Sequence, residues 1–494
     1  MLTRRQLLIG STALTGWWAG CARRLPEPGS TLVNDIHSQL NATRVDRIVR
    51  ADSLEALPRV VRRARDDGKE ISIAAGRHAM GGQQFGAGTI MVDMTGLGRV
   101  LRFDPGRGQI EVEAGIQWPA LIDYLLAAQS GRGPRWGIGQ KQTGADRLSI
   151  GGALAANVHG RGLTRKPFIE DVESFVLVDA DGARRTVSRG ENPELFRLAI
   201  GGYGLFGIIA SVTLRLAPRQ KLERVVEVIE VEDLVLAVQK RIANGFLFGD
   251  FQYATDETSD DFLRKGVFSC YRPVEEARPM PEKQKELSGE DWNRLLYLSH
   301  ADKKRAFEAY SAYYLSTSGQ LYWSDTHQLS VYVDNYHEWL DQRLGATVRG
   351  TEMITEVYVP RPALARFLAD VRADFRQNRV NVIYGTIRFI ERDDESFLAW
   401  AKERYACIIF NLHVVHTPPA LERAARDFRR LIDLAIPHGG SYYLTYHRWA
   451  TRKQVETCYP QFPEFLRLKR RHDPEERFQS DWYRHYKAMF SDVL

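Results

Sequence analysis

The chain has 494 residues, of which 44% are hydrophobic and 26% are charged, as in ordinary globular proteins of about two or three domains. Its 68 basic and 62 acidic residues leave a net charge of +6, and no compact basic run with interleaved aromatic residues occurs. The composition therefore excludes the charge pattern of a nucleic-acid-binding protein.

The N-terminus carries the pattern of an export signal. The twin arginine Arg4-Arg5 precedes an apolar stretch at 7–19, which is typical of Tat export and too short to span a bilayer. The following Gly20-Cys21 resembles a lipobox, although Trp18 departs from the usual aliphatic residue. Two alternatives stay open: Cys21 is lipidated and tethers the protein to a membrane, or the signal is simply cleaved. Both predict an extracytoplasmic protein, with a signal at 1–21 and a tether at 22–40.

Residues 41–218 alternate predicted strands and helices around Gly-rich loops. Ser53 is a suitable cap for a helix whose apolar residues 56, 57, 60 and 61 share one face. Helices are also predicted at 118–128 and 193–200, and strands at 71–74, 89–94, 109–115, 174–179, 184–187 and 208–216.

After Pro218 the Gly-rich loops disappear. Strands are predicted at 225–231, 354–359, 381–390 and 405–415, and amphipathic helices at 361–376 and 420–435. This pattern favours a separate α+β domain over 219–455. The last segment, 456–494, is basic, aromatic and helical.

Three Gly-rich segments are candidates for contact with a cofactor. The first, 75–83, contains Arg77 and His78 among small residues whose backbone N–H groups suit a pyrophosphate. The second, 149–162, is small over a dozen positions and would let a flat ring approach the backbone. The third, 201–209, contains a formal GxGxxG, but a predicted helix precedes it and a strand follows, so a Rossmann site is rejected.

In this order and spacing, the three segments resemble the FAD-binding domain of the vanillyl-alcohol oxidase / p-cresol methylhydroxylase (PCMH) superfamily over about residues 44–218. The resemblance implies an α+β fold: a two-subdomain PCMH-type FAD-binding domain at 41–218, a cap domain with an antiparallel sheet at 219–455, and a C-terminal segment that returns to the FAD domain. His78 falls where alditol oxidases and cytokinin dehydrogenases carry the histidine bonded to the flavin 8α carbon. Residues 151–160 are similar to decaprenylphosphoryl-ribose and sugar-lactone oxidases.

The resemblance also implies a set of FAD-binding residues, with a single covalent bond through His78 because residues 156–158 include no cysteine. This set is Ala74, Ala75, Gly76, Arg77, His78, Ala79, Met80, Gly81, Gly82, Gln83, Ser149, Ile150, Gly151, Gly152, Ala156, Asn157, Val158, His159, Gly207, Ile208 and Tyr443.

Hydride transfer from a C–H beside a hydroxyl also requires a base for the hydroxyl proton. His159, Tyr446, His447 and Arg448 are the predicted catalytic residues, Arg448 as a cation for the reduced flavin. Glu356, Arg388 and His413 lie on predicted strands and are expected to face the cavity. No metal site is predicted, because His413 and His416, three apart on a strand, point to opposite faces. Cys270, Cys407 and Cys458 form no CxxC motif and are expected to be mostly buried.

The leading hypothesis is an FAD-dependent oxidoreductase that removes a hydride from a sugar, a sugar lactone or a polyol. Oxygen or a respiratory electron acceptor would reoxidise the flavin. A cytokinin-dehydrogenase-like amine oxidation and a flavin-binding lipoprotein without turnover stay open as alternatives. No nucleic-acid partner is expected.

Overall fold

The structure is a computed structural model that describes residues 31–129, 135–142, 144–330 and 336–494. The predicted signal at 1–21, with Cys21, lies outside the described residues. Residues 31–40 differ from the expected tether, because β1 (Leu32–Val33) pairs with β2 (Thr43–Arg44) and Asp35 and Ser38 are buried. The Asp35 carboxylate accepts hydrogen bonds from Ser38 and Asn41, so this stretch is part of the packed fold.

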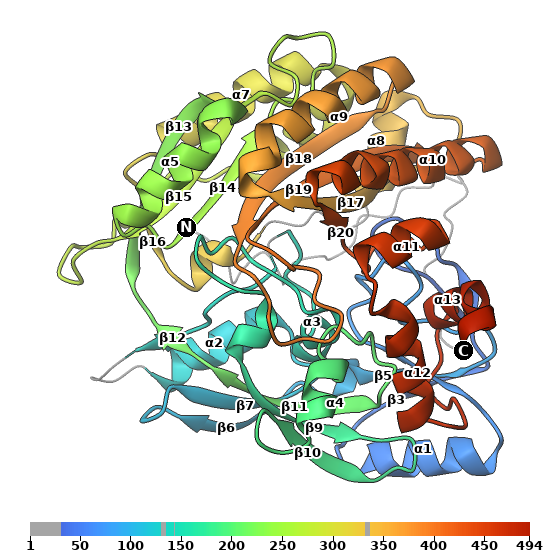
Figure 1. Cartoon of the computed structure of the whole chain (residues 1–494). Helices are drawn as coiled ribbons and strands as arrows, with labels where there is room; N and C mark the ends of the chain where they lie inside the picture. Colours follow the sequence, from blue (N-terminus) through green and yellow to red (C-terminus); the bar gives the residue numbers. More distant parts are fainter. Residues whose placement is uncertain (1–30, 130–134, 143, 331–335) are drawn as a thin grey trace, which may run out of the picture.

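A three-stranded parallel sheet lies at the N-terminal end of the fold, in the order β3 (Arg47–Arg50), β5 (Ile90–Asp93), β4 (Ile71–Ala74). The predicted helix before β4 is α1 (Ala56–Asp66), which begins after Glu55 with no side-chain cap instead of at Ser53. The end of the chain joins this sheet: Ile71 N donates to Arg477 O (2.7 Å) and Gln479 N donates to Ile71 O (2.8 Å). Figure 1 shows the C-terminal helices beside these strands.

A five-stranded antiparallel sheet follows. Its order is β10 (Arg184–Ser188), β9 (Val172–Val178), β11 (Ile208–Arg215), β7 (Gln109–Glu113), β6 (Val100–Asp104). The GxGxxG segment lies between α4 (Pro193–Ala199) and β11, which confirms that a helix precedes it and a strand follows.

An eight-stranded antiparallel sheet is the largest sheet of the described residues (Figure 1). Its order is β16 (Leu321–Trp323), β13 (Lys221–Glu230), β15 (Lys265–Pro273), β14 (Phe248–Tyr253), β18 (Val382–Ile390), β19 (Tyr405–Val415), β17 (Gly350–Pro360), β20 (Ser441–Tyr442). The helices α5 (Val231–Ala243), α9 (Leu364–Asn378) and α10 (Pro418–Ala435) cover one face. The other face turns toward the FAD-binding half and toward α6 (Gly289–Ala301), α7 (Lys303–Ser316) and α8 (Tyr336–Leu344).

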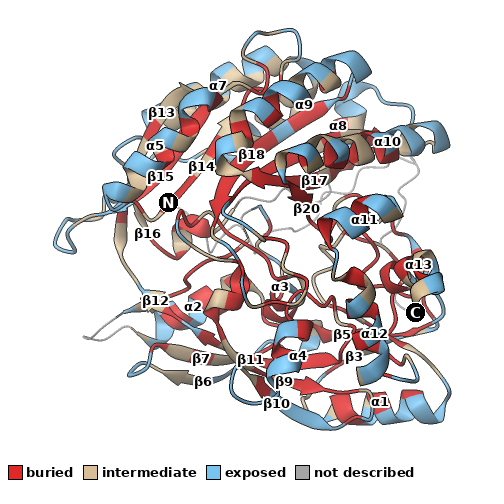
Figure 2. Ribbon diagram, viewed as in Figure 1, coloured by how far each residue is buried: buried red, intermediate tan, exposed pale blue. Residues whose placement is uncertain are grey.

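The buried residues follow the three sheets and the inner faces of the helices, as Figure 2 shows. The remaining α-helices are α2 (Trp118–Ala128), α3 (Ile150–Ala156), α11 (Arg452–Cys458), α12 (Phe462–His472) and α13 (Asp481–Met489). Cys270, Cys407 and Cys458 are buried and free, which confirms their expected burial. Within the described ranges, none of the helices combines the length and the apolar character that crossing a bilayer requires.

Candidate active site

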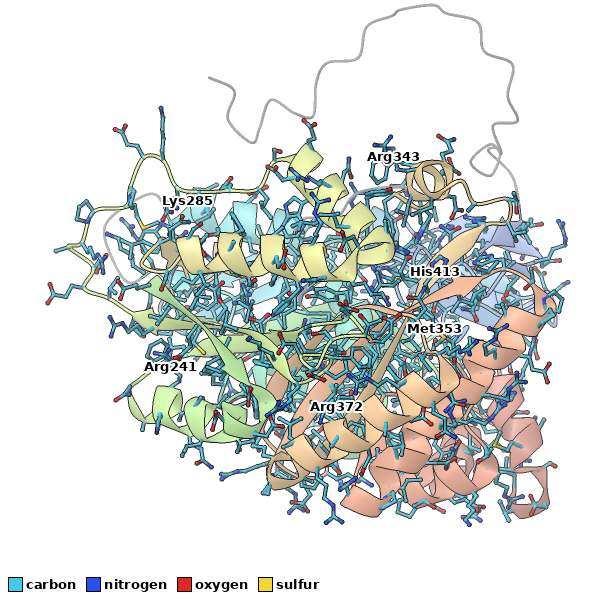
Figure 3. All side chains as sticks on the ribbon, turned by 90° about the horizontal axis from the view of Figure 1, so that it is seen from above. Arg241, Lys285, Arg343, Met353, Arg372 and His413 are labelled. Atoms are coloured by element: carbon cyan, nitrogen blue, oxygen red, sulfur yellow. The ribbon has the colours of Figure 1, made fainter. Side chains whose placement is uncertain are left out.

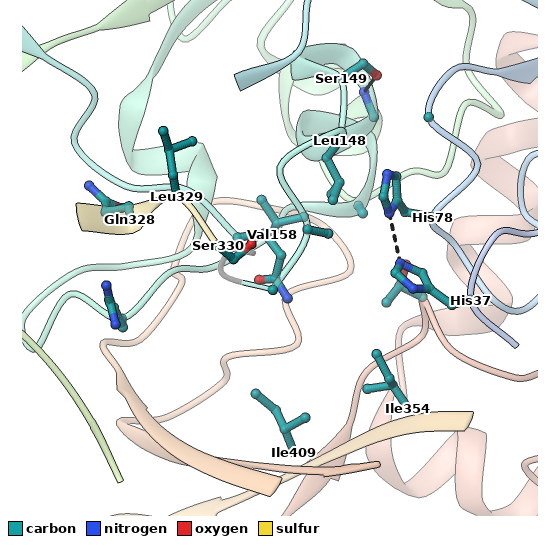
Figure 4. Close-up of a pocket in the computed structure, with 18 of the residues that line it drawn as sticks. His37, His78, Leu148, Ser149, Val158, Gln328, Leu329, Ser330, Ile354 and Ile409 are labelled. Carbon is teal, nitrogen blue, oxygen red and sulfur yellow. Dashed lines mark hydrogen bonds between the residues drawn. The ribbon is translucent and has the colours of Figure 1, made fainter. Parts of the chain in front are cut away.

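A cavity of about 710 Å³ lies between the loop after β4, the start of α3 and the inner face of the eight-stranded sheet. Small-molecule sites usually have volumes of about 300–1,000 Å³. Figure 4 shows His78 and Leu148 on one side of it and Ile354 and Ile409 on the other. The predicted site residues that line it are Ala74, Ala75, Gly76, Arg77, His78, Ala79, Met80, Gln83, Ser149, Gly151, Gly152, Ala156, Val158, Gly207, Tyr443 and Tyr446.

Eight of the predicted site residues lie outside this lining: Gly81, Gly82, Ile150, Asn157, His159, Ile208, His447 and Arg448. Some of them hold neighbouring segments together. The Asn157 amide, for example, donates to Asp393 (2.9 Å) and accepts from the Ile169 N–H (3.0 Å), which joins α3 to the segment after β18.

The loop after β4 has no room for larger side chains at two of its glycines. A Cβ on Gly76 would lie 2.4 Å from the carbonyl oxygen of Arg147, and one on Gly81 would lie 2.3 Å from that of Tyr446. Arg77 between them adopts a φ of 57°, a left-handed conformation that side chains rarely adopt. These close approaches explain why small residues recur in this loop.

The segment 443–448, far away in the sequence, holds this loop in place. Met80 N donates to Thr445 O (3.0 Å), and the Gln83 amide donates to Leu444 O (2.7 Å). The Arg448 guanidinium donates to Gly81 O (2.7 Å) from outside the cavity. Two segments that the sequence analysis singled out separately are therefore one structural unit.

His78 projects from this loop into the cavity wall, where Figure 4 shows its contact with His37. Its Nδ1 lies 2.9 Å from His37 Nε2, and its buried Nε2 has no hydrogen-bond partner among the described residues. Burial holds the pKa of His78 well below its ordinary value and lowers that of His37 to about 4. Both rings are therefore neutral near pH 7, so one nitrogen of His78 keeps a free lone pair.

The second Gly-rich segment begins α3, and its glycines let this helix approach β7. Ser149 Oγ accepts the Gly152 N–H (3.2 Å), which caps the helix, and Gly151 N donates to Ala114 O (2.7 Å). A Cβ on Gly151 would lie 2.8 Å from the Ala114 Cβ. Backbone therefore forms much of the cavity wall at this point, as a flat ring would require.

A hydrogen-bonded group of three side chains lies at the sheet side of the cavity. Glu356, on β17, accepts from His159 Nε2 (2.6 Å) through Oε1 and from the Tyr446 hydroxyl (3.2 Å) through Oε2. Burial alone would raise the pKa of Glu356, but His159 and then Arg388 outweigh it and hold that pKa below its ordinary value. Of the three, Tyr446 lines the cavity, and its pKa is raised well above the ordinary value by burial.

The two predicted catalytic residues after Tyr446 point elsewhere. His447 stacks on Trp449, with ring centroids 4.2 Å apart, and burial lowers its pKa to about 4. Arg448 makes the contact with Gly81 described above. Neither side chain lines the cavity. The contacts of both side chains in this structure position the segment 443–448.

The lining farther along the sheet is cationic and aromatic. The Arg224 guanidinium donates hydrogen bonds to the Tyr271 and Thr317 hydroxyls (both 2.9 Å). By contrast, Arg388 Nε and Nη1 have no hydrogen-bond partner among the described residues. The basic lining residues are Arg77, Arg161, Arg224, Lys285 and Arg388, and the acidic ones are Asp250 and Glu286.

The residues present fit FAD. Buried polar atoms that lack a partner among the described residues gather on the cavity wall, where a bound molecule would satisfy them. They include atoms of His78, Gln84, Gln142, Arg161, His327, Gln328, Arg388 and Asn411. When bound, FAD supplies the redox chemistry, and the loop 75–83, the start of α3 and Tyr443 would hold it.

Sequence reasoning missed several residues of this site, among them His37, Arg161 and Arg224, and only partly placed Glu356. His37 fell within the expected tether, although its ring contacts His78. Glu356 was expected on a cavity-facing strand, but its link between His159 and Tyr446 joins three positions that are distant in the sequence. No local motif signals either contact.

The sequence of the chain is similar to those of known FAD-binding proteins. Residues 45–188 match a family described as FAD binding domain. The L-gulono-1,4-lactone dehydrogenase of Mycobacterium tuberculosis (strain ATCC 25618 / H37Rv) is 27% identical over 440 residues, which is 88% of this chain and 95% of that protein. The decaprenylphosphoryl-beta-D-ribose oxidase of Mycolicibacterium smegmatis is 28% identical over 36% of this chain and 38% of its own length.

A mammalian relative gives the same picture: the L-gulonolactone oxidase of Bos taurus is 28% identical over 35% of this chain and 37% of its own length. These proteins are named for lactone or sugar oxidation, and the family match covers the segment that holds His78 and α3. Residues 45–188 thus form an FAD-binding domain, and the chain is an FAD-linked oxidoreductase that is similar to lactone and sugar dehydrogenases and oxidases.

Proposed function

We propose that the chain oxidises a CH–OH group of a sugar lactone or a related polyhydroxylated small molecule, with its FAD bonded covalently to His78. The observation that carries this proposal is the unpartnered Nε2 of a neutral, buried His78 on the wall of a cavity that also presents Tyr446. A neutral imidazole nitrogen with a free lone pair is a nucleophile, and His78 lines the cavity that fits FAD.

The covalent bond is tested by the absorption spectrum of the purified protein before and after acid precipitation. We expect yellow colour to stay in the pellet for the natural protein and to move to the supernatant for His78→Ala. Release of all the flavin from the natural protein would contradict the bond at His78 but leave FAD binding intact. A properly folded, FAD-supplied protein with no flavin would contradict the whole proposal.

His37 supplies a graded control for the same experiment. In the tautomer in which Nδ1–H of His78 donates to His37 Nε2, the lone pair of His78 lies on Nε2. His37→Phe removes that acceptor but keeps a ring in the space, so we expect the fraction of covalent flavin to fall while bound flavin remains. An unchanged covalent fraction would show that His37 does not orient His78.

The cationic lining favours an oxygen-rich substrate. Arg388 lines the cavity and has two nitrogens without a hydrogen-bond partner among the described residues, whereas a protonated amine would meet five basic lining residues and two acidic ones. Amine oxidation of the cytokinin-dehydrogenase kind is therefore the weaker alternative. The relatives are named for catalytic activities, which argues against a flavin-binding protein without turnover.

Tyr446 and Glu356 give the hydroxyl proton of the substrate a path into the protein. Because its pKa is raised, the Tyr446 phenol stays protonated; it can accept the substrate proton only as it passes its own proton to Glu356 Oε2. The lowered pKa keeps the Glu356 carboxylate ionised, and its Oε2 is free of the His159 contact and can accept this proton. His159 acts as a positioning residue, and we keep Arg448 and His447 as supports of the segment 443–448.

Turnover is tested by anaerobic mixing of the holoenzyme with L-gulono-1,4-lactone and related lactones and polyols, with a cytokinin-type amine in a parallel series. Bleaching of the flavin near 450 nm by a hydroxylated compound is the expected outcome. Bleaching by the amine alone would favour the alternative. Reoxidation by oxygen compared with a quinone or dye acceptor then decides between an oxidase and a dehydrogenase.

We also propose that the chain is exported through its Tat-type signal, acts outside the cytoplasm and is tethered to a membrane if Cys21 is lipidated. The organisation proposed for the rest is a two-subdomain FAD domain at 41–218, a cap at 219–455 and a closing segment at 456–494. Mass spectrometry of the protein from its own cells would show whether the mature chain begins at Cys21 and whether it carries lipid.

A further inference from the structure

A second cluster of titratable side chains lies on the cavity-facing side of the eight-stranded sheet, outside the cavity lining. Glu352 on β17 and His413 on β19 are directly opposite each other, and His300 comes from the C-terminal end of α6. The side chains of Glu352 and His300 are each 4% exposed, and that of His413 is 18% exposed. Figure 3 shows His413 on the sheet beside the helix that carries Arg343, α8.

The contacts inside this cluster are too long for strong ion pairs. His300 Nε2 and His413 Nδ1 each lie 3.3 Å from the same oxygen, Glu352 Oε1. A charge-assisted N–H···O bond is usually about 2.7–2.9 Å long. His300 Nε2 is also out of line for a hydrogen bond and has no partner for one among the described residues.

The same distances match those between ligands of one metal ion. Zinc bonds to imidazole nitrogen and carboxylate oxygen are about 2.0–2.1 Å long, so neighbouring ligands of a tetrahedral ion lie roughly 3.3–3.4 Å apart. The three ligand atoms of His300, Glu352 and His413 all lie within 4.8 Å of one another. Imidazole and carboxylate groups together suit zinc and other divalent transition metals.

The other carboxylate oxygen is held by Tyr336, and a third histidine lies close to it. The Tyr336 hydroxyl donates to Glu352 Oε2, and His337 Nδ1 lies 3.1 Å from it. His337 is 3% exposed, and neither of its nitrogens has a hydrogen-bond partner among the described residues. Groups that bind the second oxygen of a metal-ligating carboxylate fix its orientation, as they do around many metal sites.

We propose that His300 Nε2, Glu352 Oε1 and His413 Nδ1 bind one divalent transition-metal ion, with zinc as the best match, and that water completes its coordination. The ion would join α6 to two central strands, β17 and β19. Ile354 and Asn411, two residues along those strands on the same face, line the active-site cavity. The site would therefore fix the cavity wall, and it is independent of the reaction proposed above.

The test is zinc content and coordination in the tag-free holoenzyme after incubation with Zn²⁺ and removal of the excess. We expect close to one zinc per chain. Zinc-edge X-ray absorption should show nitrogen and oxygen ligands near 2.0–2.1 Å with imidazole scattering. Less than a tenth of an equivalent, or sulfur ligands from the three cysteines, would overturn the proposal without needing any variant.

Variants then assign the ligands. We expect Glu352→Gln, His300→Ala and His413→Ala to lose retained zinc, and Tyr336→Phe to weaken binding about ten- to hundredfold. His416→Gln and Glu338→Gln are the matched controls, because His416 bonds to Thr351 and Glu338 is exposed on α8. Both controls should keep the full equivalent. Zinc retained by a folded Glu352→Gln, with its flavin spectrum intact, would contradict the site.

Discussion

Glu352 and Glu356 lie four residues apart on β17, both buried, and both contact histidines, yet their surroundings differ in kind. Glu356 makes one short contact of 2.6 Å with His159 and one with the Tyr446 hydroxyl. Glu352 has two imidazole nitrogens at 3.3 Å from one oxygen, and a third histidine at 3.1 Å from the other. Residue type and burial are alike in the two clusters, so contact geometry distinguishes them.

A proton lies between His159 Nε2 and Glu356 Oε1 in their short contact. His159 Nδ1 lies 3.1 Å from Gly160 O, which can only accept, so that nitrogen carries a hydrogen and a further proton is shared with Glu356. Cys407 lies close to this pair, but burial raises the pKa of its thiol well above the ordinary value, so it stays protonated and is a poor ligand. Glu356 is therefore suited to move protons and Glu352 to hold a cation.

The largest effect should come from Glu356→Gln, which keeps the shape of the side chain but removes the carboxylate. We expect the rate of flavin reduction by substrate to fall about 10²- to 10⁴-fold, the usual contribution of a general base. Stopped-flow absorbance near 450 nm measures it. Glu338→Gln, an exposed glutamate on α8, is the control and should reduce its flavin at the natural rate. A Glu356→Gln variant as fast as this control would remove Glu356 from the proton path.

Tyr446→Phe should have a smaller effect of the same kind. Because a water molecule can take the place of the hydroxyl and bridge the substrate to Glu356, we expect a loss of roughly ten- to hundredfold in the same rate. The Tyr443→Phe variant, which loses a bond to the Ala156 carbonyl instead of one to Glu356, tests whether any buried hydroxyl matters equally. An equal loss in the two variants would argue that Tyr446 acts through packing.

The two clusters also mark what the sequence could and could not predict. The predicted helices at 361–376 and 420–435 correspond to α9 (Leu364–Asn378) and α10 (Pro418–Ala435), because each has a clear apolar stripe that packs on the sheet. By contrast, α7 (Lys303–Ser316) has no buried residue and therefore no such stripe, and it was not predicted.

The site residues follow the same rule. His78 and the start of α3 were predictable because the small residues around them make a local pattern. Most of the residues predicted in these two segments line the cavity. The contacts of His37 with His78 and of Glu356 with His159 join residues 41 and 197 positions apart, so no spacing could reveal them. His413 and His416 do point apart, as predicted, but the partners of His413 come from two other elements.

A third prediction concerns thermal stability. It distinguishes Glu352 from Glu356 by the effect of zinc on the Tm of their variants. If zinc binds the folded chain alone, a free concentration one hundred times its Kd stabilises the fold by about 2.7 kcal/mol. We expect Zn²⁺ to raise the Tm of the natural protein and of Glu356→Gln, and to leave that of Glu352→Gln unchanged. Differential scanning fluorimetry with and without Zn²⁺ measures this, and an equal rise in both variants would contradict the assignment to Glu352.

The smallest effect concerns a buried histidine that contacts no glutamate. Burial lowers the pKa of His447 to about 4, with Asp35 opposing and Arg448 reinforcing the shift, so the folded chain keeps the ring neutral where the unfolded chain protonates it. Below its ordinary pKa of 6.5 the unfolded state therefore binds more protons, and stability falls as the pH drops from 6.5 toward 4.

At pH 5 this loss amounts to roughly 2 kcal/mol from His447 alone, relative to pH 7.5. The variant His447→Phe keeps the stacking on Trp449 but has no titrating ring, so its Tm should fall less between pH 7.5 and pH 5 than that of the natural protein. His438→Phe, which changes a histidine paired with Asp370 near the surface, is the control and should not reduce this pH dependence. Equal pH dependence in His447→Phe and the natural protein would mean that His447 is charged in the fold. Burial would then not suffice to keep this histidine neutral against the nearby Asp35, and His447 could not serve as the uncharged case beside the two glutamate clusters.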